Sequence, residues 1–177
     1  MVSVRIVKEE GRRMELKEEL AKAIEFEKEG KNVYTEVAGT TFNPMVKKAF
    51  EFLAAEEERH IKQIQNYVEN EELPKPEGAS KKDVKEFFKM TVDEYKEGVE
   101  FSADDKSAYE KAMELEKDSY NYYKEQLAKA EDERLKDFFS FLMEQESAHY
   151  LMLEKTLNFV KDPQHFYAEQ EDWSFEG

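Results

Sequence analysis

Six side chains that can bind metal ions occur in this sequence as two sets of three, and the second set follows the first at a constant offset of 89 residues. In each set, a glutamate is followed 30 residues later by a Glu-x-x-His pair. The sets are Glu27, Glu57 and His60 in the first half, and Glu116, Glu146 and His149 in the second. Carboxylate and imidazole groups suit both iron and manganese. Four carboxylates and two imidazoles therefore predict a site for two metal ions.

A tyrosine recurs at the same offset, two helical turns after the first glutamate of each set. Tyr34 and Tyr123 then lie on the same helix face as Glu27 and Glu116. We expect both hydroxyls to donate hydrogen bonds to the ligating carboxylates and so to orient them. The alternative, a core tyrosine whose hydroxyl bonds to backbone, stays open for both. The recurrence of the histidines in register with the glutamates likewise favours ligation over ordinary core or surface histidines.

Four long helices are predicted to position these residues. Apolar residues recur with a period near 3.6 over residues 14–38, 44–70, 104–129 and 133–161. Glu27 and Glu57 each lie 15 residues from Phe42, in the turn between the first two helices. In an antiparallel hairpin, both side chains then lie at one level, roughly 20 Å from the turn. Glu116 and Glu146 are placed in the same way in the second hairpin, and each Glu-x-x-His pair shares one helix face.

The segment between the second and third helices, residues 71–103, is long enough to cross the length of a bundle. Within it, Ser80 and Thr91 each precede an acidic residue at the third position, which predicts two short capped helices. Asn43 and Asp132 are predicted N-caps of the second and fourth long helices. The expected fold is an all-α four-helix bundle with a long crossover between the second and third helices, built from two repeated helical hairpins.

The domain organisation follows from these helices. Residues 1–13 are expected to form an N-terminal arm, and residues 14–161 the bundle, with repeats at about 14–70 and 104–161. Residues 162–177 begin with the helix-ending pair Asp162–Pro163 and contain several aromatic side chains, so we expect this tail to pack on the bundle.

Composition excludes several classes of function. The net charge of −15 disfavours nucleic acid and anionic membranes as partners, because both would repel this surface. The absence of cysteine excludes disulfides, thiolate catalysis and iron–sulfur clusters. No apolar run approaches the roughly 20 residues that span a bilayer. The first residues lack the apolar stretch of a signal peptide, so we expect a cytoplasmic protein.

The motifs together resemble the rubrerythrin-like branch of the ferritin-like superfamily, over about residues 16–160. The segments that carry this resemblance are Glu27 to Tyr34, Glu57-Glu-Arg-His60, Glu116 to Tyr123 and Glu146-Ser-Ala-His149. The resemblance implies a ferritin-like bundle in which the six Glu and His side chains hold two iron ions, with manganese possible. It also implies that Glu57 and Glu146 bridge the ions. Two features depart from the family pattern: an extra carboxylate is replaced by Ser119, and the chain has no Cys-ligated rubredoxin module.

The resemblance implies a rubrerythrin-type oxidoreductase. Such an enzyme would reduce hydrogen peroxide, or react with dioxygen, and a separate rubredoxin-type protein or flavoprotein would supply its electrons. We expect a homodimer by the same analogy. Three alternatives remain: a ferritin-like protein that oxidises and sequesters iron, a dimanganese catalase that needs no electron donor, and a structural bundle in which a metal is incidental.

Overall fold

The computed structural model describes residues 2–70, 78–95 and 101–161, and it confirms the all-α fold. The described residues form helices and connecting segments and contain no strand. The helices are α1 (Val2–Thr40), α2 (Pro44–Asn70), α3 (Lys81–Tyr95), α4 (Ala103–Lys129) and α5 (Glu133–Lys161).

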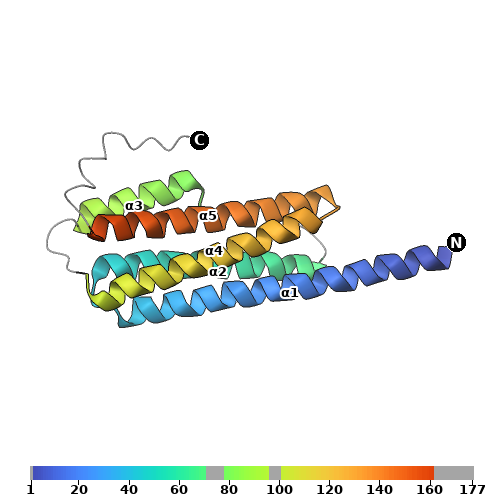
Figure 1. Ribbon diagram of the computed structural model, residues 1–177, viewed down its shortest axis with the longest axis horizontal. Helices are drawn as coiled ribbons and strands as arrows, with labels where there is room; N and C mark the ends of the chain where they lie inside the picture. The colour runs from blue at the N-terminus through green and yellow to red at the C-terminus, as the bar shows by residue number, and fades with distance from the viewer. Residues whose placement is uncertain (1, 71–77, 96–100, 162–177) are drawn as a thin grey trace.

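Two antiparallel hairpins make up the bundle, as the repeat predicts (Figure 1). Helices α1 and α2 form the first hairpin, and α4 and α5 form the second. Helices α2 and α4 run in the same direction, so the chain crosses the length of the bundle between them (Figure 1). Helix α3 belongs to this crossover and packs against α5 and α2. This topology brings the middles of all four long helices together.

Side-chain caps fix the start of the helices that carry the Glu-x-x-His pairs. The Oδ1 atom of Asn43 accepts hydrogen bonds from the backbone N–H groups of Met45 (2.9 Å) and Val46 (3.1 Å). The Oδ1 atom of Asp132 accepts one from the backbone N–H of Arg134 at 2.8 Å. Both caps satisfy donors that the first turn of a helix leaves without partners. The predicted N-caps at Asn43 and Asp132 are therefore confirmed.

The crossover holds one described helix, where the sequence predicted two. Ser80 caps α3 as expected, because its Oγ accepts from the backbone N–H of Asp83 at 3.2 Å. The prediction for Thr91 was wrong. Thr91 lies within α3, and its hydroxyl donates to the backbone carbonyl of Phe87 at 2.8 Å. A threonine can satisfy its hydroxyl in this way inside a helix, so the capping pattern alone does not mark a new start.

The two ends of the chain differ in how they compare with the predicted boundaries. Helix α1 begins at Val2 and extends past the bundle (Figure 1), whereas the sequence predicted its start near residue 14. The aromatic tail, residues 162–177, lies outside the described residues, and its packing on the bundle stays a prediction.

Apolar side chains fill the bundle on both sides of its middle. One cluster lies towards the α1–α2 turn and includes Phe50, Leu53 and Leu153. The other lies towards the α4–α5 turn and includes Ile64 and Leu142. These five side chains are fully buried. Polar groups placed between the two clusters are thus shielded from water along the bundle axis.

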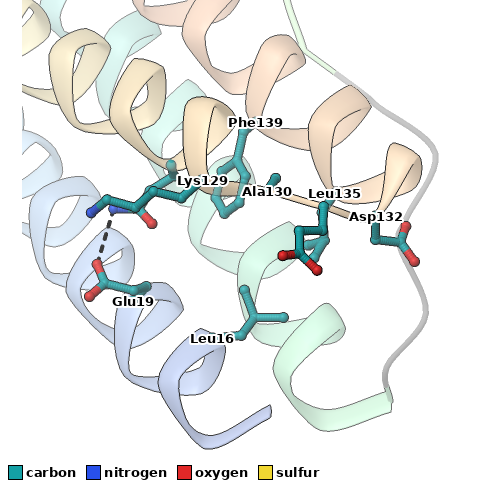
Figure 2. Close-up of a pocket in the computed structure, with 9 residues that line it drawn as sticks. Leu16, Glu19, Lys129, Ala130, Asp132, Leu135 and Phe139 are labelled. Carbon is teal, nitrogen blue, oxygen red and sulfur yellow. Dashed lines mark hydrogen bonds between the residues drawn. The ribbon is translucent and has the colours of Figure 1, made fainter. Parts of the chain in front are cut away.

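A surface pocket of about 440 Å³ lies at the end of the bundle where α4 turns into α5 (Figure 2). Glu19 on α1 lines it and accepts a hydrogen bond from Gln126 on α4 at 3.1 Å. The hydroxyl of Tyr122 donates to the backbone carbonyl of Glu19 at 2.6 Å. These bonds join the two hairpins at this end.

None of the described helices has a stretch long and apolar enough to cross a bilayer.

Candidate metal centre

The six predicted side chains meet at the middle of the bundle. They come from α1, α2, α4 and α5, and none is more than 2% exposed. They are Glu27, Glu57, His60, Glu116, Glu146 and His149. A carboxylate without a cation or proton beside it is costly to bury. The convergence of four carboxylates in this interior is therefore the feature that needs an explanation.

Within this cluster, the side chains form two groups that could each hold a metal ion. The ligand atoms of each group lie within 4.8 Å of one another. One group contains Glu27 and His60, and the other contains Glu116 and His149. Glu57 and Glu146 belong to both groups. The geometry thus offers each ion one histidine and one glutamate of its own, together with two shared carboxylates.

The histidines face the carboxylates through their Nδ1 atoms. Nδ1 of His60 lies 3.1 Å from Glu27 Oε2 and 3.4 Å from Glu146 Oε1. Nδ1 of His149 lies 3.4 Å from Glu116 Oε2. The two imidazole rings are nearly parallel, with centroids 5.5 Å apart. The nitrogens that would bind metal therefore point into the same small volume as the carboxylate oxygens.

Each tyrosine hydroxyl bonds to the carboxylate of the other repeat. Tyr34 on α1 donates to Glu116 Oε1 on α4 at 2.6 Å. Tyr123 on α4 donates to Glu27 Oε1 on α1. Both tyrosines are buried. Each hydroxyl occupies one oxygen of a glutamate that belongs to a single group, which fixes that carboxylate and leaves its second oxygen directed at the cluster.

Burial and the charges of neighbouring side chains shift the pKa values of the glutamates and histidines in the cluster. Burial and the charge of Glu57 raise the pKa of Glu27 to about 8. Burial and three neighbouring carboxylates raise the pKa of Glu146 well above its usual range. Burial opposes a charged imidazole, but the adjacent carboxylates raise the pKa of His60 and His149 well above the ordinary value. Without cations, protons must therefore balance part of the negative charge of this cluster, and metal ions would replace them.

The donor atoms that have no partner fit a metal centre. Glu116 Oε2, Glu146 Oε1 and His149 Nδ1 are buried and make no hydrogen bond to any described residue. Buried polar atoms normally have partners. These three atoms belong to one of the two groups, so a metal ion at that place would satisfy all of them.

A comparison with known families agrees with this geometry. The family model described as rubrerythrin matches residues 18–157, a range that contains all six side chains. The chain belongs to the rubrerythrin family. Membership implies metal binding, typically of iron. No significant match to a curated protein or to a solved structure was found.

One buried acid of this rubrerythrin-family chain lies next to the cluster but outside both groups. Glu56 directly precedes Glu57 and is 2% exposed. It pairs with Arg59 at 2.7 Å and accepts a hydrogen bond from the backbone N–H of Ala79 at 2.8 Å. Glu56 thus anchors the crossover to α2, and its burial is explained without a metal.

A feature that the sequence reasoning missed is a pocket of about 270 Å³ between α4 and α5. Glu116 and Glu146 line it together with Lys117, Tyr120, Ser147 and Tyr150. The pocket therefore borders the cluster. Its signal in the sequence is a difference between the repeats: Tyr120 and Ser147 stand where the first repeat has Lys31 and Glu58.

Proposed function

We propose that this protein is a dinuclear-iron oxidoreductase of rubrerythrin type, which reduces hydrogen peroxide to water. The observation that supports this proposal best is the sharing of Glu57 and Glu146 by the two metal-binding groups. Shared carboxylates hold two ions close together, and a close pair of ions suits the two-electron reduction of one small molecule. Manganese fits the same donor set, because carboxylate and imidazole ligands do not separate the two metals.

Each of the six side chains has a definite part in this proposal. Glu27 and His60 would hold one ion, and Glu116 and His149 would hold the other. Glu57 and Glu146, which belong to both groups, would contribute to both ions. A pair of ferrous ions bound here would supply the two electrons that convert one hydrogen peroxide and two protons to two water molecules.

Charge balance, the two tyrosines and the apolar surroundings would stabilise these ligands around the ions. The four carboxylates carry four negative charges, which two divalent cations balance. Tyr34 and Tyr123 hold the unshared carboxylates of the opposite repeat in place. Because the site lies between two apolar clusters, little water competes with these bonds, and each one is stronger than it would be at the surface.

The electrons that restore the ferrous state come, in this proposal, from a separate rubredoxin-type protein or flavoprotein. The chain contains no cysteine, so it cannot hold a thiolate-ligated iron centre of its own. A homodimer and a cytoplasmic location complete the proposal.

Stopped-flow mixing of the ferrous protein with hydrogen peroxide and, separately, with dioxygen tests the function. We expect faster oxidation by peroxide and no oxygen evolution when reductant is omitted. Glu57→Gln should abolish the reaction. Glu58→Gln, which changes the neighbouring half-exposed glutamate, should leave it intact. Faster oxidation by dioxygen in a hollow multimeric shell would indicate iron sequestration, and oxygen evolution without reductant would indicate a catalase.

A further inference from the structure

The pocket between α4 and α5 borders the metal-binding cluster. Its volume is about 270 Å³, against roughly 30 Å³ for one water molecule in the liquid, so it admits several small molecules. Glu116 and Glu146 form its inner wall, and both are 1% exposed. The pocket is therefore bordered by one shared and one unshared ligand residue, both of them buried.

The equivalent place on the other hairpin is bridged by an ion pair. The offset of 89 residues relates Tyr120 to Lys31 and Ser147 to Glu58. In the first repeat, the Nζ of Lys31 on α1 donates to Glu58 Oε2 on α2, which joins the two helices over the cluster. In the second repeat, a tyrosine and a serine stand at these positions and line the open pocket. A pocket thus borders the ligands of the second repeat, whereas an ion pair spans the equivalent positions of the first, although the ligands of both repeats are buried.

The chemistry of the pocket favours a small, neutral and polar molecule. Three of its side chains, Tyr120, Ser147 and Tyr150, bear hydroxyls that can donate and accept hydrogen bonds. The net charge of −15 disfavours anions, and Lys117 is the one cationic side chain among the named lining residues. Hydrogen peroxide is neutral, small and able to hydrogen-bond at both ends. A bulkier hydroperoxide would have to fit among these three side chains.

We propose that the α4–α5 pocket is the port through which small hydroperoxides reach the cluster, and that Tyr120, Ser147 and Tyr150 set the size limit. The port is one-sided: the Lys31–Glu58 pair closes the corresponding face of α1 and α2. This inference rests on the proposed function for its oxidant. Its geometry can be tested separately with nitric oxide, a small neutral molecule that binds ferrous iron.

Ser147→Trp places an indole in the port, and Glu58→Trp makes the matched change at the equivalent position of the first repeat. The measurement is the association rate of nitric oxide with the ferrous protein, after elemental analysis shows that each variant holds its iron. We expect Ser147→Trp to slow association about tenfold, because each molecule must wait for the indole to leave the pocket. Glu58→Trp, which replaces one partner of the Lys31–Glu58 pair by an indole, should not slow association. If both variants slow nitric oxide association equally, or if Ser147→Trp does not slow it, the proposal that this pocket is the port is wrong.

Tyr120→Ala tests the size limit in the opposite direction. It widens the pocket without touching the six ligands, so we expect tert-butyl hydroperoxide to oxidise the ferrous protein faster, while the rate with hydrogen peroxide changes little. An unchanged ratio of the two rates would overturn the assigned role of Tyr120. Tyr120→Ala also tests whether the pocket is the port if Ser147→Trp does not bind iron.

The two measurements separate the port from the proposed function. Suppose that the wild-type protein does not react with hydrogen peroxide, and that nitric oxide binds more slowly to Ser147→Trp than to wild type. Peroxide reduction would then be refuted, and the proposal that the pocket is the port would stand. Suppose instead that the wild-type protein reduces peroxide, and that nitric oxide binds equally fast to wild type and to Ser147→Trp. The proposed function would then stand, and the proposal of the port would be refuted.

Discussion

The two hydrogen bonds between tyrosine and glutamate cross from one repeat to the other, and each can be removed without changing a ligand. Tyr123→Phe deletes the hydroxyl that donates to Glu27 Oε1. Tyr34→Phe deletes the corresponding donor to Glu116 Oε1, where the bond is 2.6 Å long. Because both tyrosines are at most 1% exposed, water cannot readily replace the lost donor.

The expected loss follows from the kind of bond. A hydrogen bond to a charged group contributes about 1.5–3 kcal/mol, and removal of such a partner of a metal ligand lowers metal affinity about 10- to 100-fold. Tyr123→Phe should weaken the ion held by Glu27 and His60, and Tyr34→Phe the ion held by Glu116 and His149. Each single variant should therefore retain one tight ion and one weakened ion.

Competition with a chelator, followed by optical absorbance of bound Co(II), measures the two affinities. Tyr109→Phe is the matched control, because Tyr109 is also fully buried on α4 but belongs to the apolar core and to neither metal-binding group. It should bind two ions as tightly as wild type. If both Tyr34→Phe and Tyr123→Phe also bind two ions with wild-type affinity, the two bonds do not orient ligands. If one variant weakens both ions equally, the assignment of one tyrosine to one ion is wrong.

Three further predictions concern the ligands and the stability of the bundle. Glu57→Ala should lower the affinity for both ions, whereas Glu116→Ala should lower it for one, because Glu57 belongs to both groups and Glu116 to one; metal titration with elemental analysis distinguishes these results. Removal of metal with a chelator should lower Tm, since each ion present at about 100 times its Kd adds about 2.7 kcal/mol, or about 5–11 °C in a chain of this size, to be measured by thermal unfolding. Tyr122→Phe should destabilise the protein by about 1 kcal/mol in urea unfolding and leave metal affinity unchanged, because it removes the bond to the Glu19 carbonyl, which lies at the end of the bundle.

The fold and the meeting point of the six side chains could be predicted because both depend on regular spacing. A rise of 1.5 Å per residue and equal distances from the turn place Glu27 and Glu57 at one level. The constant offset repeats that placement for Glu116 and Glu146. Such an argument needs no knowledge of packing, and the buried cluster agrees with it.

Other features depend on contacts that spacing within one helix does not determine. The sequence indicated that Tyr34 would donate to a carboxylate, but not that the acceptor would be Glu116 of the other repeat. Thr91 matched a capping pattern but bonds to the carbonyl of Phe87 within α3. In both cases the hydroxyl had more than one acceptor within reach, and the three-dimensional arrangement decided between them.

The arrangement also makes each hairpin incomplete without the other. The first repeat alone would place Glu27, Glu57 and His60 together, but its metal-binding group also includes Glu146. Its unshared carboxylate would lack the hydroxyl of Tyr123, which comes from α4. Since burial raises the pKa of Glu27 to about 8, an isolated hairpin would gain by protonating or exposing this group rather than burying its charge. Metal binding would therefore be coupled to the docking of the two hairpins, and we expect that separating the repeats weakens both metal-binding groups.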